Sequence, residues 1–154
     1  MPPIGAPFLA WEDEAAIAGW LDRAPPAVSD AFLTDQHRNL ALIRERGFQV
    51  ALRSPGSPRL APEFGEGAGY AAGYKDRMLG MAGALREIPL PETIEPDTLY
   101  DVILIAAPVF DAEGRCAFSL CLGDFTGRLD GGTILAHAER LVAACLAVMQ
   151  ADRG

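Results

Sequence analysis

Two apolar runs separated by a short polar connector dominate the hydrophobic pattern of the chain. The first run, Val102–Phe110, carries no polar side chain, and the second spans residues 116–122. The connector, residues 111–114, ends in a glycine, which is typical of a hairpin turn. We therefore predict a β-hairpin whose first strand is buried on both faces, at the centre of a sheet covered by helices.

Apolar residues at helical spacing predict four helices around this hairpin. They fall at residues 12–23, 29–46, 70–88 and 133–151, with Ser29 as the N-cap of the second helix. Cations in the last turn of the second helix and Gly47 after it form a C-terminal signal. A short strand is predicted at residues 48–52.

The segments between these elements are predicted loops and connectors, at residues 53–69, 90–98 and 124–132, because proline and glycine or polar residues dominate them. Together the elements predict an α+β fold, in which a small antiparallel sheet with a central hairpin packs against helices.

Length and charge narrow the class of protein. The 154 residues indicate a single domain spanning residues 1–154, and half of them are hydrophobic. A net charge of −8 opposes binding of nucleic acid by this chain alone, because phosphates repel it. No apolar run reaches the roughly 18 residues that cross a bilayer, and no signal peptide is recognisable. We therefore expect a cytoplasmic protein that binds no membrane.

The three cysteines are expected to be small core residues. Their odd number and the absence of a CxxC motif argue against a disulfide framework or a zinc site. Cys116 and Cys121 lie five positions apart on one predicted strand, so they point to opposite faces unless a bulge intervenes. Cys145 falls on the apolar side of the last helix.

No catalytic signature is present, and we predict neither an enzyme, nor a metal site, nor a cofactor. His37 and His137 fall on solvated helix faces, and no HExxH or GxSxG motif occurs. Asp111 and Glu113 occupy the hairpin tip, where exposed carboxylates are ordinary. Asp101 faces either a pocket or solvent.

The hairpin sequence IAAPVFDAEGRCAFSLCL resembles the final hairpin of the effector-binding domain of IclR-type transcriptional regulators. In that family an Ala-Ala-Pro-Val-Phe-Asp-x-x-Gly-Arg segment precedes an apolar strand, a glycine-containing loop and a closing helix. Residues 44–50, RERGFQV, are similar to the family's helix-to-strand turn, and residues 5–11 resemble the segment opening its second half. The GAF domain shares this layout.

The resemblance implies the C-terminal part of a GAF-like effector-binding domain, without the family's winged helix-turn-helix and without the first part of that domain. It implies a cytoplasmic homodimer in transcription regulation that senses a small molecule held between the sheet and its loops. The ligand-binding residues expected here are Tyr74, Met78, Tyr100, Val102, Leu104, Cys121 and Gly123. The hairpin positions among them, Val102, Leu104, Cys121 and Gly123, are apolar. A buried carboxylate needs donors, so the expected ligand is apolar or aromatic.

Two alternatives stay open beside ligand sensing. One is a ligand-free structural or dimerisation module, and the other is an enzyme of unrecognised type. An enclosed pocket lined by Val102, Leu104, Cys121 and the helix at 70–88 would favour the sensor, and a filled sheet face would favour the module. A histidine bonded to a carboxylate inside a cleft would favour the enzyme.

Overall fold

The computed structural model describes residues 6–22, 30–53 and 90–151 of the chain. The predicted helix at 70–88 and nearly all of the predicted loop at 53–69 lie outside these residues. In chain order the elements are α1 (Ala6–Leu9), α2 (Glu14–Leu21), α3 (Asp30–Arg46), β1 (Gln49–Leu52), β2 (Leu99–Tyr100), β3 (Val102–Phe110), β4 (Cys116–Gly123), β5 (Leu129–Asp130) and α5 (Gly131–Ala151).

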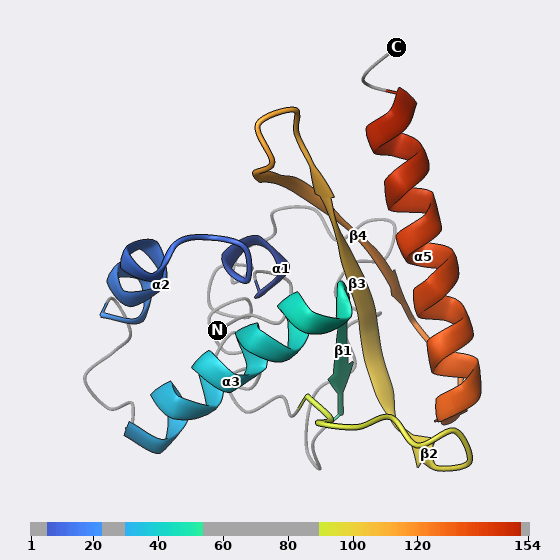
Figure 1. The fold of residues 1–154 in the computed structure, drawn as a ribbon. Helices are drawn as coiled ribbons and strands as arrows, with labels where there is room; N and C mark the ends of the chain where they lie inside the picture. The colour runs from blue at the N-terminus through green and yellow to red at the C-terminus, as the bar shows by residue number, and fades with distance from the viewer. Residues whose placement is uncertain (1–5, 23–29, 54–89, 152–154) are drawn as a thin grey trace, which may run out of the picture.

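Strand β3 lies at the centre of a three-stranded antiparallel sheet of order β1-β3-β4. Figure 1 shows α5 along one face of this sheet, with α1 and α3 on its other side. All eight residues from 102 to 109 are buried. The predicted α+β architecture and the predicted strand buried on both faces are therefore confirmed.

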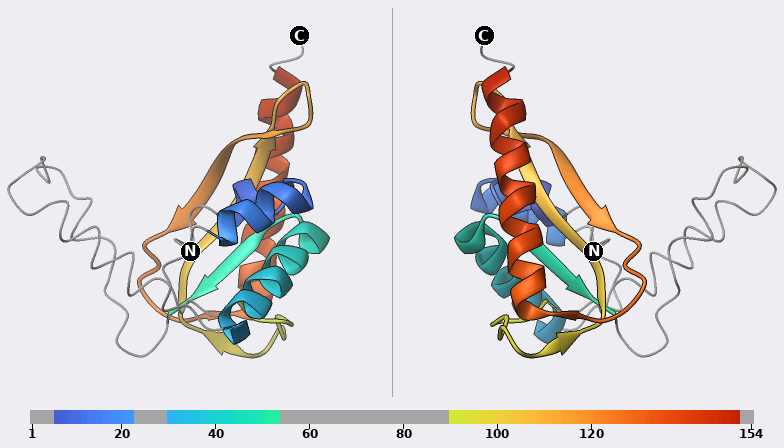
Figure 2. Two further views of the ribbon diagram at one scale, coloured as in Figure 1. Left: turned by 90° about the vertical axis from the view of Figure 1, so that its left-hand side faces the viewer. Right: turned by 90° about the vertical axis from the view of Figure 1, so that its right-hand side faces the viewer.

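Helix α5 covers one face of the hairpin along its length (Figure 2). Its buried residues recur at the three- and four-residue spacing of a single helical stripe. They pack against the alternate β3 residues that point to that side, and the shared core contains Ile105, Ala107, Val109, Ile134, Ala138, Leu141 and Cys145. By length and composition alone, the 21 residues of α5 could also cross a membrane. A core helix passes the same test, and here this stripe lies on the sheet.

A second core lies between the three N-terminal helices, where Ala10, Leu40 and Ile43 are buried. Arg44 fixes this arrangement, because its Nε donates to the carbonyl oxygen of Ala10 at 2.6 Å. Helix α3 ends as predicted, with Gly47 in the left-handed region at a φ of 78°. Among the described residues before Gly47, the short helix α1 is the one helix that the sequence analysis did not predict.

Two bulges decide which residues share a face of the sheet. Opposite β1, Leu52 pairs with Val102 and Ala51 pairs with Leu104, so Ile103 is an extra residue in β3. Opposite β3, Phe110 pairs with Cys116 and Val109 with Phe118, so Ala117 is an extra residue in β4.

The bulge in β4 corrects the expectation for the cysteines. Cys116 and Cys121 lie opposite Phe110 and Ala106, which are four residues apart on β3, so both cysteines belong to the same face. Cys145 is buried as expected and Cys116 is partly buried, but Cys121 is exposed. The prediction that all three are core residues is wrong for Cys121.

A small second sheet anchors the start of α5. Strand β5 lies within the loop predicted at 124–132 and pairs with β2. Helix α5 begins at Gly131, two residues before the predicted start. The Asp130 carboxylate caps the helix by accepting from the Thr133 N–H and hydroxyl, both at 2.8 Å. These two bonds hold the pKa of Asp130 below its ordinary value. The Gly131 N–H donates to Thr98 at 3.0 Å.

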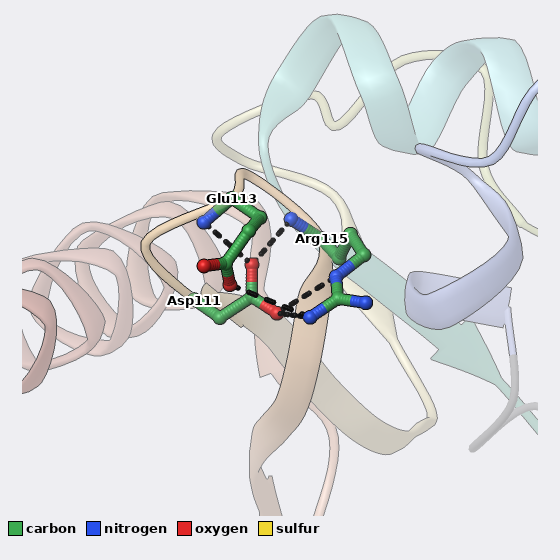
Figure 3. A network of polar contacts seen from close by, with 3 residues as sticks. All are labelled: Asp111, Glu113 and Arg115. Atoms are coloured by element: carbon green, nitrogen blue, oxygen red, sulfur yellow. Dashed lines mark hydrogen bonds and ion pairs between the residues drawn. The ribbon is translucent and has the colours of Figure 1, made fainter.

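The hairpin tip is organised by the Asp111 carboxylate (Figure 3). Its Oδ1 accepts from the N–H groups of Arg115 at 2.8 Å and Glu113 at 3.1 Å, and its Oδ2 accepts from the Arg115 Nε at 3.0 Å. The bond from the Arg115 N–H, and then the guanidinium, hold the pKa of Asp111 below its ordinary value of 3.8. These hydrogen bonds therefore stabilise the hairpin turn.

We predict that Gly131→Ala destabilises the protein by about 2 kcal/mol, a typical cost of overpacking. A Cβ at this position would lie 2.7 Å from the Glu95 carbonyl carbon and closer still to its oxygen, which is backbone that cannot rotate away. Gly132→Ala is the matched control, because its Cβ would meet the Asp130 side chain at 3.2 Å and the Pro96 carbonyl oxygen at an ordinary contact distance of 3.8 Å. Equal urea midpoints for the two variants would contradict this account.

We also predict that the stabilisation supplied by Asp111 disappears in acid. A carboxyl whose folded-state pKa lies below 3.8 stabilises the fold above that pH, and the contribution is lost as the pH falls through the folded pKa. The difference in melting temperature between the wild type and Asp111→Asn should therefore shrink between about pH 6 and about pH 2.5. A difference independent of pH would show that the charge of Asp111 is irrelevant.

Candidate functional site

The face of the sheet turned away from α5 carries three of the predicted ligand-binding residues. Strand register places residues directly opposite one another in rows across the three strands. One row is Gln49, Ala106 and Cys121, and the next is Ala51, Leu104 and Gly123. We call these six residues the open face, after the solvent-exposed edge at Cys121 and Gly123 of β4. Leu104, Cys121 and Gly123 are thus brought together as expected.

The open face changes in exposure from one edge to the other. Gln49 and Ala51 of β1 and Leu104 and Ala106 of β3 are buried, whereas Cys121 and Gly123 of β4 are exposed. None of these six side chains is charged. The rows therefore lead from a buried edge at β1 to a solvent-accessible edge at β4.

Gln49 is the anomaly of this face. Its side chain is only 1% exposed, yet neither Nε2 nor Oε1 has a hydrogen-bond partner in the described part of the chain. Its cross-strand neighbour is Ala106, which offers no polar side chain. A buried carboxamide left unpaired costs about 1–3 kcal/mol. Such a group at the inner end of a row is suited to recognise a polar atom of a ligand.

Two of the other predicted ligand-binding residues, Val102 and Tyr100, lie elsewhere. The bulge at Ile103 turns Val102 into the core beneath α5, opposite to Leu104. Tyr100 lies in β2, where its hydroxyl accepts from the N–H of Glu95 at 2.9 Å. Tyr74 and Met78 lie outside the described residues. The binding role of the predicted set stays a prediction.

An open groove of about 300 Å³ lies at the free edge of β3, beyond the start of β1. It runs between the C-terminal half of α5 and the end of α3. Trp11 and Phe110 meet edge to face in its wall, with ring centroids 5.3 Å apart, and Leu146 and Met149 of α5 line the other side. No described member of the predicted ligand-binding set lines this groove.

The polar groups beside the groove hold the fold together. Arg46 at the end of α3 donates from Nη1 to the carbonyl oxygen of Pro91 at 2.7 Å, and Phe110 donates its N–H to the sulfur of Met149 at 3.3 Å. Burial raises the pKa of the Cys145 thiol, so this groove residue is not an activated thiolate at neutral pH. The groove offers an apolar wall rather than reactive groups.

The candidate acid–base residues of the sequence lie neither on the open face nor in the groove. His37 Nδ1 lies 3.8 Å from Glu14 Oε1, and both side chains are about half exposed or more. His137 packs against Phe125, with ring centroids 6.1 Å apart. Asp101 is exposed and accepts from Arg53 Nε at 3.2 Å. Among the described residues, no three His, Cys, Asp or Glu side chains are placed to hold a metal ion.

Sequence reasoning missed Gln49 and the groove for different reasons. A single polar residue within the apolar run at 48–52 is common at an exposed strand edge, so Gln49 drew no attention. The interruption of that run was nevertheless the available signal. The groove is assembled from the segment after α1, the ends of α3 and β3 and the end of α5, so no local sequence pattern could predict it.

Comparison with known proteins adds no family assignment. No protein-family model, no curated protein and no solved structure matches this chain. The functional argument therefore depends on the chain's own geometry.

Proposed function

We propose that this chain is a small-molecule-sensing domain of a transcriptional regulator, and that its open face binds a neutral apolar or aromatic effector. The observation that carries the proposal is the buried, unpartnered carboxamide of Gln49 in one row with Ala106 and Cys121. Contact with DNA would belong to another segment or to a partner, because this acidic chain repels phosphate.

The resemblance to the effector-binding domain of IclR-type regulators supports this proposal. Two of its sequence blocks adjoin in space, because the turn at Gly47 leads into β1 and β1 pairs with β3 of the hairpin. The open face is built from these same two blocks. A binding surface at the junction of the segments that carry the resemblance fits a sensor better than a purely structural module.

The chemistry of the open face defines the ligand class. A carboxamide presents a donor and an acceptor side by side, so it pairs best with a neutral group that offers both, such as an amide. An ionised carboxylate offers only acceptors and needs donors or a cation, and the open face contains no charged residue. The apolar body of the ligand would lie on Leu104 and Ala106, with its polar group at Gln49.

A ligand bound on the open face can influence the rest of the domain through β3. The six residues come from all three strands of the sheet, and the opposite face of β3 packs against α5. A ligand that binds one arrangement of these elements better than another shifts the population towards it. Helix α5 is the element through which such a shift would leave the domain.

We predict that Gln49→Met raises the free energy of unfolding of the ligand-free protein by about 1 kcal/mol, because it removes an unpaired buried carboxamide at nearly constant volume. Gln36→Met is the matched control, since Gln36 is also largely buried but keeps 9% of its surface exposed to solvent, against 1% for Gln49. Urea denaturation measures both. A loss of stability on Gln49→Met larger than on Gln36→Met would show that the carboxamide already has a partner.

Binding is predicted to follow the order benzamide, then toluene, then benzoate. A probe at about 100 times its Kd adds about 2.7 kcal/mol to stability, which a thermal shift detects. Gln49→Met should remove the advantage of benzamide over toluene while leaving toluene binding intact. Leu146→Lys, a substitution on the half-exposed wall of the groove, should leave all three affinities unchanged.

The other possible results distinguish binding on the open face from binding in the groove. Loss of binding on Leu146→Lys, with none on Gln49→Met, would move the ligand to the groove. Absence of a shift with these probes and with a panel of small aromatic and acyl compounds would overturn the sensor proposal.

A further inference from the structure

Cys121 is the solvent-exposed end of the row that begins at the carboxamide of Gln49. The two side chains belong to one face of the sheet, on either side of Ala106. Since neighbouring strands lie about 4.8 Å apart, about 10 Å separates the backbones at the two ends of the row. One end therefore offers a buried donor and acceptor with no partner among the described residues, and the other offers an accessible thiol.

The surroundings of Cys121 differ from those of the other two cysteines. Cys145 is buried and Cys116 is partly buried, whereas Cys121 is exposed. Burial raises the pKa of the Cys116 and Cys145 thiols, which keeps both in the protonated, weakly nucleophilic form at neutral pH. Of the three cysteines, Cys121 is thus the one that a compound in solution reaches directly.

The Cys121 thiol is positioned by Ser119, its neighbour on the same face of β4. The Ser119 hydroxyl donates to the carbonyl oxygen of Ala107 at 3.2 Å. The hydroxyl oxygen is therefore left to accept the S–H of Cys121, whose sulfur lies 3.9 Å from it. This contact directs the S–H bond towards Ser119, and the sulfur lone pairs stay available to an electrophile.

We propose that the open face takes a neutral α,β-unsaturated carboxamide and that Cys121 captures it covalently. This inference rests on the proposed function and narrows the chemical class of its effector. The amide group of such a ligand pairs with Gln49, and its β-carbon lies one conjugated C=C bond further along the row, towards Cys121. A hydrogen bond of about 2.9 Å at one end, the short conjugated body and a carbon–sulfur bond at the other end fit a row of about 10 Å.

The proposed reaction is an addition, in which no group leaves and nothing is oxidised. The Cys121 sulfur attacks the β-carbon, so that an S–C bond forms and the π electrons of the C=C bond move through the α-carbon onto the carbonyl oxygen. The α-carbon then takes up a proton in place of the one that the thiol has lost. The Gln49 Nε2–H group donates to the carbonyl oxygen, and this hydrogen bond strengthens as negative charge develops there. Recognition and acceleration therefore use the same carboxamide.

The first test is the rate at which N-phenylacrylamide alkylates the full chain, followed by mass spectrometry of the intact protein and of its peptides. The wild type should carry one adduct, on Cys121, and the rate should saturate with probe concentration because binding precedes bond formation. Saturating benzamide, which competes for Gln49, should slow the reaction. Cys121→Ser should stay unmodified under conditions in which the wild type reacts completely.

Two variants separate a directed reaction from that of an ordinary exposed thiol. Gln49→Met should lower the rate about tenfold, which corresponds to the loss of about 1.4 kcal/mol of hydrogen bonding. Cys116→Ser, on the same strand and the same face, is the matched control and should react at the wild-type rate. Circular dichroism checks that each variant is folded, and the competition by benzamide tests the same point on the wild type.

A rate that rises in proportion to probe concentration and is unchanged by benzamide would overturn the proposal, because Cys121 would then react as any exposed thiol does. An adduct mainly on Cys116 or Cys145 would also overturn it. A thermal shift with benzamide, without directed alkylation of Cys121, would overturn the covalent step and leave the proposed function intact. Alkylation and thermal shift are separate measurements, so the failure of one proposal is distinguishable from the failure of the other.

Discussion

The burial of β3 on both faces is the constraint on which the rest of this structure depends. From residue 102 to 109 the strand has no polar side chain, and every residue in that range is buried. Each face therefore needs a cover, and each edge needs a hydrogen-bonding partner. Helix α5, strand β1 and strand β4 supply three of these requirements from segments far apart in the sequence, and α1 contacts β3 and β4 on the side away from α5.

The two faces meet this constraint in different ways. Beneath α5, branched side chains such as Ile105 and Val109 interlock with Ile134 and its helical neighbours. On the open face the side chain at the centre of its row is Ala106, and the row begins at the unpaired carboxamide of Gln49. The first arrangement gives a stable core. The arrangement on the open face costs stability, because one buried polar group is unpaired. Such a cost is expected at a ligand-binding site.

Much of the fold could be predicted from local sequence patterns. The features that could not be predicted depend on how strands pair with one another. The bounds of β3 and the end of α3 at Gly47 were predictable, because a long apolar run and a glycine after basic residues are local signals. The bulges at Ile103 and Ala117 were not, because a bulge exists only relative to the opposite strand. The two-residue strands β2 and β5 are too short to leave a periodic pattern.

The candidate site shows the same division. Alternation along a strand correctly grouped Leu104 with Cys121 and Gly123 once the hairpin register was added. It failed for Val102, since the single extra residue at Ile103 reverses the face of everything before it. Gln49 could be recognised only from its burial, which arises from tertiary packing.

The central claim is that the Gln49 carboxamide is the polar contact of a ligand on the open face. The most direct measurement is an isotope-edited NMR experiment on the protein saturated with benzamide. The account predicts intermolecular NOEs from the Gln49 side-chain amide protons to the benzamide ring protons. NOEs from the Trp11 indole and the Met149 methyl group in their place would contradict it, because those two residues line the groove at the edge of β3.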